Sequence, residues 1–132
     1  MMKPVCEIMV LEVLPGIRAM VARKLVEKHG LSQKAAAEKL GTTQPAISQY
    51  KREVRGSKYR SLESSPQVIE MIDSIAARTA SGKLSGQQDI SSEFCSVCRF
   101  MRKEGLACEF HRRMYPSLEN CTICMDGKGP SC

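Results

Sequence analysis

The chain has 132 residues and a formal net charge of +6, and only 5% of its residues are aromatic. This length allows one ordinary domain or two very small ones. No apolar run approaches the roughly 20 residues that a membrane-spanning helix needs, so we expect no membrane partner. The N-terminal segment lacks the long apolar core of a secretion signal, and we therefore expect a cytoplasmic protein.

The positive charge is concentrated in the first part of the chain. Residues 1–60 hold 12 Lys and Arg against 5 Asp and Glu, residues 61–90 hold 2 against 4, and residues 91–132 hold 6 against 5. A local positive field favours a polyanionic partner through phosphate contacts and counterion release. Nucleic acid is therefore a candidate partner of the first part, and a solvated basic surface is the alternative.

The predicted elements are helices, and no clear strand is evident. A short helix is expected from Pro4, and Pro15 and Gly16 are expected to interrupt the apolar run that follows it. The segment 17–29 has apolar residues at helical spacing, which predicts an amphipathic helix that ends at Gly30.

Two short helices follow and meet at a glycine. Ser32 is a suitable N-cap for a helix over 33–40. Gly41 is expected to end this helix, because glycine reaches positive φ without a steric penalty. Thr43 offers a cap for the next helix, over 43–52.

This pair of helices has the pattern of a helix-turn-helix. Leu40, Ile47 and Tyr50 are spaced to pack inward, so the second helix presents polar side chains on its other face. Hydroxyl, amide and guanidinium groups of this kind read base edges or hold phosphates. The outward-facing residues are Thr43, Gln44, Ser48, Gln49 and Arg52.

The stretch SQKAAAEKLGTTQPAISQY resembles the helix-turn-helix of the phage-repressor-like (XRE-type) transcription regulators. The resemblance covers about residues 17–77. It implies a lambda-repressor-like domain that lays its third element in the major groove, usually as a homodimer on a two-fold operator in duplex DNA. It also implies that Gln33 would meet phosphate or support Gln44. By the same resemblance, Thr43, Gln44, Ser48 and Gln49 would face bases, and Lys51, Arg52, Arg55 and Lys58 would mainly contact the DNA backbone.

The second half of the chain begins with another predicted helix, over 67–80, which Ser65 and Pro66 start. The small polar stretch 81–90 is interpreted as a linker. A further helix is expected to end at Gly105, and the chain from Leu106 onward is expected to form loops. The predicted domains are a helix-turn-helix domain over 1–80, a linker over 81–90, and a small cysteine-rich, metal-bound helical and loop domain over 91–132.

Six of the seven cysteines lie in the last 38 residues, from Cys95 to Cys132. Thiolates two residues apart readily share one tetrahedral metal, so two Cys-x-x-Cys pairs predict a metal centre. Basic residues close to the pairs would help to hold the sulfurs as thiolates. The candidate ligands are Cys95, Cys98, Cys108, Cys121 and Cys124, with His111 as a substitute. The basic residues are Arg99, Arg102, Lys103, Arg112 and Arg113.

Three chemistries remain open for this cluster. An iron–sulfur cluster, of the 4Fe–4S type, would use four of the five cysteines. Structural zinc would use the two Cys-x-x-Cys pairs, or would substitute Cys108 or His111 for one ligand. Thiol–disulfide switching would need no metal. A spare ligand suits a labile or redox-active centre, and we therefore expect the iron–sulfur cluster, with zinc as the alternative.

The whole chain resembles a group of small archaeal regulators that join an XRE-type domain to a cysteine-rich tail. The opening MMKPVCEIMVLEVLPGIRAMVARKLVEKHGLSQ and the tail segments GLACEFH and LENCTIC carry this resemblance, which implies a transcription regulator. We expect a sequence-specific regulator whose cluster senses redox or iron–sulfur status. The alternative is a zinc-stabilised regulator or protein-interaction adaptor with a purely structural metal. No nucleophile–base pair or phosphate loop is evident, so we expect neither an enzyme nor a small-molecule substrate.

Overall fold

The computed structural model describes residues 5–53, 60–118 and 120, and within these ranges the chain is helical and contains no strand. The mostly α class predicted from the sequence is confirmed. No helix within the described ranges combines the length and the apolar character that crossing a membrane requires. The α-helices are α1 (Val5–Ile8), α2 (Leu14–Glu27), α3 (Gln33–Leu40), α4 (Gln44–Glu53), α5 (Arg60–Glu63), α6 (Pro66–Ala80), α7 (Gln87–Lys103) and α8 (Leu106–Met114). A π-helix, η1 (Met9–Val13), and a 3₁₀ turn, η3 (Pro116–Leu118), complete the described elements.

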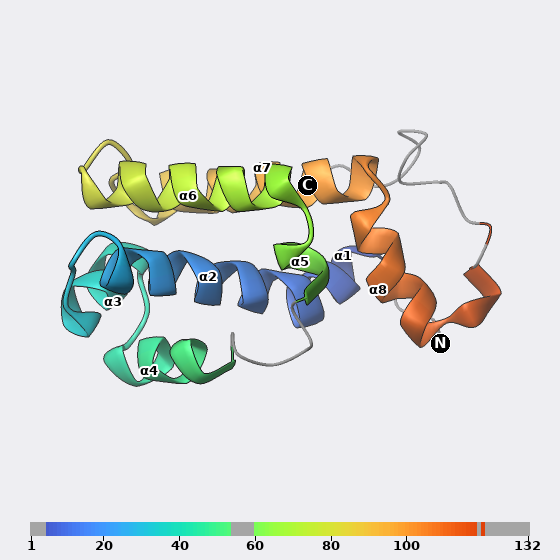
Figure 1. Cartoon of the computed structure of the whole chain (residues 1–132), viewed down its shortest axis with the longest axis horizontal. Coiled ribbons are helices and arrows are strands. Elements are labelled where there is room, and N and C mark those ends of the chain that lie inside the picture. The colour runs from blue at the N-terminus through green and yellow to red at the C-terminus, as the bar shows by residue number, and fades with distance from the viewer. Residues whose placement is uncertain (1–4, 54–59, 119, 121–132) are drawn as a thin grey trace.

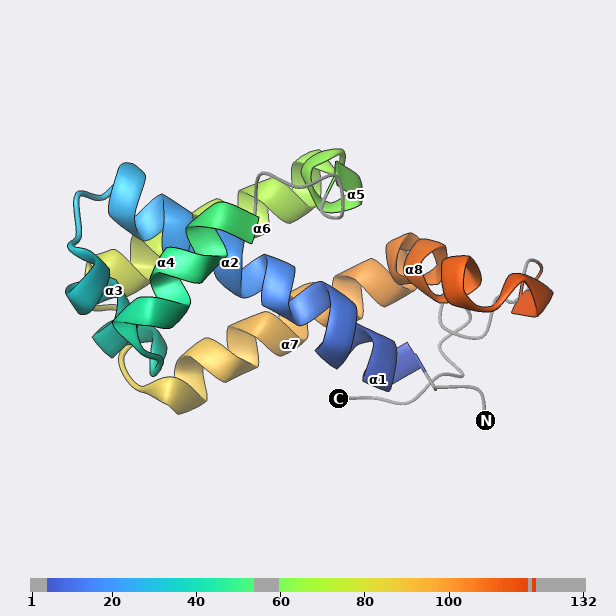
Figure 2. The ribbon, with the colours of Figure 1, turned by 90° about the horizontal axis from the view of Figure 1, so that it is seen from below.

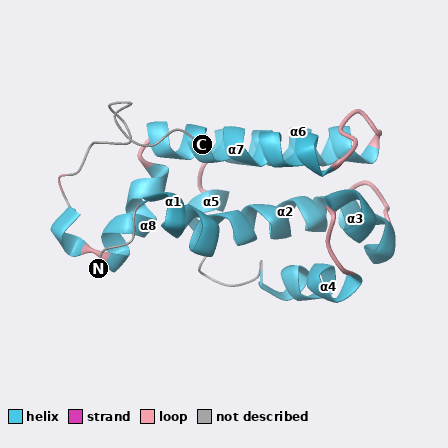
Figure 3. Ribbon diagram, turned by 180° about the vertical axis from the view of Figure 1, so that it is seen from behind, coloured by secondary structure: helices cyan, strands magenta, loops and turns pink. Residues whose placement is uncertain are grey.

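Helix α2 lies at the centre of the molecule, with helices packed on both sides of it. On one side α6 and α7 lie next to each other, and α4 packs on the opposite side (Figure 1). The pair α3 and α4 lies at one end of the molecule, and α8 lies at the other end (Figure 3). Helix α7 runs between these two ends and contacts α3 near its start and α8 at its finish (Figure 2).

The predicted break at Pro15 is wrong, because α1, η1 and α2 follow one another without an interruption. Within the π-helix the hydrogen-bond ladder is displaced by one residue, and the N–H of Leu14 bonds to the carbonyl of Met9. Pro15 then falls just after the π-helix, whose displaced hydrogen bonds accommodate a residue that has no N–H within a continuous helix. Gly16 is buried, so its lack of a side chain serves close packing here.

A single cluster of buried apolar side chains connects the two halves of the chain. It includes Ile17 and Leu25 of α2, Ile47 of α4 and Ile72 of α6, and it continues into α7 and α8. The members from the last two helices are Ile90, Phe94, Val97, Cys98, Met101 and Ala107. The buried cluster therefore extends across the predicted boundary between the two domains, and the division into domains itself stays a prediction.

Two expectations for the second half of the chain need correction. The predicted linker over 81–90 is shorter in the structure, because α7 already begins at Gln87. The loops expected from Leu106 onward are wrong as far as Met114, since α8 occupies this segment. Gly105 has a φ of 76°, which ends one helix and lets the next begin after a sharp turn. Ala107 and Cys108 are buried, and this burial stabilises a helix that its short sequence pattern did not reveal.

Candidate nucleic-acid interface and cysteine cluster

The turn between α3 and α4 has the local geometry that the sequence predicts. The Ser32 hydroxyl accepts a hydrogen bond from the N–H of Ala35 at 3.0 Å, which caps α3. Gly41 has a φ of 67° and ends this helix in the left-handed conformation. The N–H of Thr42 then donates to the carbonyl of Ala37 at 2.9 Å. These bonds fix the angle at which the chain enters α4.

Helix α4 has one buried side and one polar side. The Thr43 hydroxyl oxygen accepts a hydrogen bond from the N–H of Ala46 at 3.3 Å and caps the helix, which leaves the hydroxyl proton available to donate outward. Ile47 is fully buried, and Leu40 of α3 packs partly buried against the same core. The inward packing predicted for these two side chains is confirmed, whereas the Tyr50 side chain lies outside the part that the structure describes.

The predicted DNA-contacting residues that the structure describes lie on α3 and α4. Thr43, Gln44 and Gln49 are exposed, while Gln33 and Ser48 are half-buried. Gln33 and Gln44 are the first residues of their helices, where backbone N–H groups point outward and favour phosphate. The side chains of Lys51 and Arg52, and all of Arg55 and Lys58, lie outside the described residues.

Several cations on the helices around this turn are exposed to solvent. They are Arg18, Lys28, Lys34 and Lys39. Lys24 is different, because its ammonium group forms a 2.8 Å ion pair with Asp73 of α6. A hydrogen bond from Lys24 holds the pKa of the Asp73 carboxyl below its ordinary value of 3.8. Lys24 therefore joins α2 to α6, while the exposed cations remain accessible to solvent.

Comparisons with known proteins support this reading of α3 and α4. The helix-turn-helix family model matches residues 23–58, which include the end of α2 and all of α3 and α4. This segment is therefore a helix-turn-helix domain of the XRE type, a family of DNA-binding regulators. The match covers well under half of the chain. Comparisons with curated proteins and with solved structures found no match.

The cysteine cluster lies partly inside the described residues. Cys95 and Cys98 are one turn apart on α7, and Cys108 is on α8. Cys98 and Cys108 are buried and Cys95 is half-buried. Within the described ranges, no three His, Cys, Asp or Glu side chains come close enough to hold a metal ion. The other two candidate ligands, Cys121 and Cys124, lie outside those ranges, so the structure does not test the predicted ligand set.

The surroundings of the described cysteines suit a metal bound by thiolates. Arg102 is one turn beyond Cys98 on α7 and only 6% exposed, which is unusual for a guanidinium group. The same four-residue spacing separates Cys108 from Arg112 on α8. A buried cation near a buried sulfur favours the thiolate form, which is the form that binds metal. The imidazole of His111 packs edge-on against the Tyr115 ring, with 5.6 Å between ring centroids.

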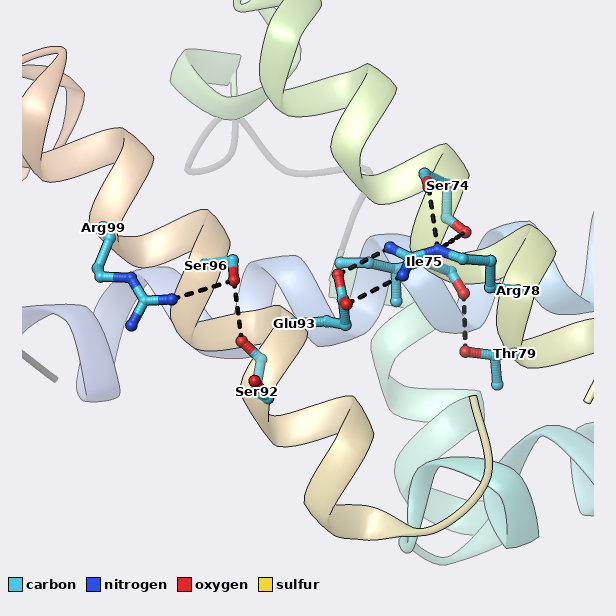
Figure 4. A network of polar contacts seen from close by, with 8 residues as sticks. All are labelled: Ser74, Ile75, Arg78, Thr79, Ser92, Glu93, Ser96 and Arg99. Atoms are coloured by element: carbon cyan, nitrogen blue, oxygen red, sulfur yellow. Dashed lines mark hydrogen bonds and ion pairs between the residues drawn. The ribbon is translucent and has the colours of Figure 1, made fainter. Parts of the chain in front are cut away.

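One interaction between helices was missed by the reasoning from sequence. Arg78 of α6 and Glu93 of α7 form a two-pronged ion pair, with N–O distances of 2.9 and 2.7 Å (Figure 4). Hydrogen bonds from Arg78 hold the pKa of the Glu93 carboxyl below its ordinary value of 4.5. The two residues are 15 positions apart on different helices, so no local spacing pattern could have identified them.

Proposed function

We propose that this protein is a sequence-specific DNA-binding transcription regulator whose cysteine-rich segment holds an iron–sulfur cluster. The observation that carries the DNA-binding part is the capped helix α4, which buries Ile47 and exposes Thr43, Gln44 and Gln49 within the matched helix-turn-helix. In this proposal α4 enters the major groove, where amide side chains read base edges and the first turns of α3 and α4 meet phosphates.

A homodimer on a two-fold operator completes the DNA-binding proposal. A ten-residue reading helix covers only a few base pairs, so a single copy recognises a short half-site. Two copies would place two such helices about one DNA turn, or about 34 Å, apart. The oligomeric state in solution, with and without a selected duplex, tests this part.

The first experiment selects duplexes from a random library and compares Gln44→Ala with the wild-type protein on the selected duplex. We expect Gln44→Ala to lose about 1–3 kcal/mol of binding free energy and to relax specificity at one position. Gln67→Ala is the control, because this exposed glutamine lies in the first turn of α6 rather than in a helix of the turn. An equal loss on every sequence would make Gln44 a backbone contact. An adaptor for another protein would show little salt-dependent binding to any duplex.

The metal part of the proposal rests on the spacing of the two Cys-x-x-Cys pairs in the sequence, of which the structure describes the first, Cys95 and Cys98, on one turn of α7. Further ligands would come from Cys121 and Cys124. When bound, an iron–sulfur cluster would supply one-electron chemistry or a labile centre, which is what sensing of redox or iron–sulfur status needs. The chain's own residues would hold sulfur as thiolate and limit the access of solvent to it.

Iron, sulfide and zinc content, with a visible absorption spectrum, should be measured on protein purified without oxygen. We expect stoichiometric iron and sulfide, which Cys98→Ser loses and Cys132→Ser retains. Cys132 is the control because it stands apart from the Cys-x-x-Cys pairs in the sequence. A colourless protein with one zinc would instead show that the cysteine-rich segment holds a structural zinc site, and it would contradict redox sensing by an iron–sulfur cluster.

A further inference from the structure

Helix α7 contacts the helix-turn-helix directly with its first turns. Ile90 and Phe94 are 3% and 8% exposed and belong to the same buried cluster as Ile47 of α4. The family match ends at residue 58, so α7 lies outside the recognised helix-turn-helix. Its contact with α3 is therefore an addition to that domain.

The first turns of α7 contact α3 and face the turn between α3 and α4. A cavity of about 250 Å³ lies between the two parts. The turn contributes Leu40, Gly41 and Thr42 to its lining, and α7 contributes Ile90, Ser91 and Phe94. Because the turn sets the direction of α4, a shift of α7 against this turn would reorient the helix that faces DNA.

A second set of contacts fixes α7 on α6. Glu93 accepts both hydrogen bonds of the two-pronged ion pair with Arg78. The Arg78 guanidinium also donates through Nε to the hydroxyl and the carbonyl oxygen of Ser74, at 3.2 and 3.4 Å (Figure 4). Arg78 is thus held by residues of both α6 and α7. A bidentate pair of guanidinium and carboxylate fixes the relative orientation of the two groups in addition to stabilising their contact. Glu93 directly precedes Phe94 on α7 and lies about one turn beyond Ile90.

We propose that Arg78 and Glu93 are positioning residues for DNA binding, and that they act by holding α7 against the turn between α3 and α4. This inference rests on the proposed DNA-binding function. Neither residue needs to touch DNA, and the effect passes through Ile90 and Phe94 to Gly41 and from there to α4.

The variant Glu93→Gln is the test, because the loss of its negative charge and the loss of its ion pair with Arg78 should change the affinity for DNA in opposite directions. Removing a negative charge should by itself strengthen binding to a polyanion. If α7 is no longer held against the turn, binding should instead become weaker, and we expect about three- to tenfold weaker binding to the selected duplex. Asp89→Asn is the matched control, because it removes the same charge from an exposed position in the first turn of the same helix.

A second variant tests whether weaker DNA binding comes from the lost ion pair rather than from a change of net charge or of stability. Arg78→Lys keeps the positive charge but loses the two-pronged contact, and we expect it to weaken binding in the same direction. Both side chains of the pair are partly exposed, at 36% and 28%, so the variants should remain folded, which circular dichroism will show. If Glu93→Gln and Asp89→Asn bind the duplex equally, the proposal is overturned.

Amide hydrogen exchange without DNA separates this inference from the proposed function. We expect Glu93→Gln to speed exchange in peptides covering residues 38–48, while Asp89→Asn leaves it unchanged. If the wild-type protein binds no duplex but this difference is seen, the DNA-binding proposal fails while the contact through α7 stands. If the wild-type protein binds the duplex but the exchange rates are equal, the positioning role is wrong.

Discussion

Truncation of Ile90 to alanine tests whether α7 and the helix-turn-helix unfold together. Ile90 is 3% exposed and belongs to the cluster that also contains Ile47 and Ile72. The substitution removes three carbon atoms, each worth about 0.8 kcal/mol of burial. Residues of this size cost about 2–5 kcal/mol when they are truncated to alanine. Since Ile90 already borders a cavity, we expect the lower part of this range, about 2–3 kcal/mol.

The assay is urea unfolding followed by circular dichroism, combined with amide exchange of peptides from α4 and α7. We expect one transition that moves to lower urea without a change of slope, and faster exchange in both helices. Ser91→Ala is the control, because this exposed neighbour should change stability by no more than about 0.5 kcal/mol. If Ile90→Ala speeds exchange in α7 and leaves α4 unchanged, the two helices belong to separate folding units and the reasoning from the shared core is wrong.

Three further predictions concern local geometry and ion pairs. Gly41→Ala places a Cβ at a φ of 67° and should lower the free energy of unfolding by about 1 kcal/mol, measured in urea. Ser65→Ala removes the oxygen that accepts the Val68 N–H at 3.4 Å and should cost about 1 kcal/mol in the same assay. The pKa values of Asp73 and Glu93 are lowered in the folded protein, so acid titration followed by circular dichroism should show their contribution present above about pH 4.5 and lost as pH falls below it. Glu93→Gln should make that loss smaller.

The sequence predicted best where one residue determines a local backbone feature. Ser32, Gly41 and Ser65 mark helix boundaries through their own hydrogen bonds or φ values, and each boundary is confirmed. Pro15 misled the prediction, because its effect depends on whether the preceding hydrogen bonds are displaced, and a π-helix displaces them.

Features that depend on distant residues were beyond the reach of sequence spacing. Arg78 and Glu93 each look like an ordinary charged residue on an amphipathic helix, and only the placement of α6 beside α7 makes them a pair. The start of α7 at Gln87 was missed for a similar reason, since Ile90 is one apolar residue in a polar stretch and is buried by packing in a cluster that distant helices share. The polar side chains of α4 could be assigned to the outside because Ile47 fixes which side of that helix is buried.

The fold also connects the two proposed activities through one helix, α7. Ile90 lines the same cavity as the turn of the helix-turn-helix, and Cys98 lies eight residues further along α7, which is about 12 Å at the rise of an α-helix. A helix of this length moves as one body, so a change at the cysteines that displaces α7 would reach the turn without an intermediate element. Linkage then requires that any effect of metal binding on DNA affinity be matched by an equal effect of DNA on metal affinity. Metal affinity measured with and without the selected duplex would therefore measure the coupling along α7, and Glu93→Gln, which removes the ion pair between α6 and α7, should reduce it.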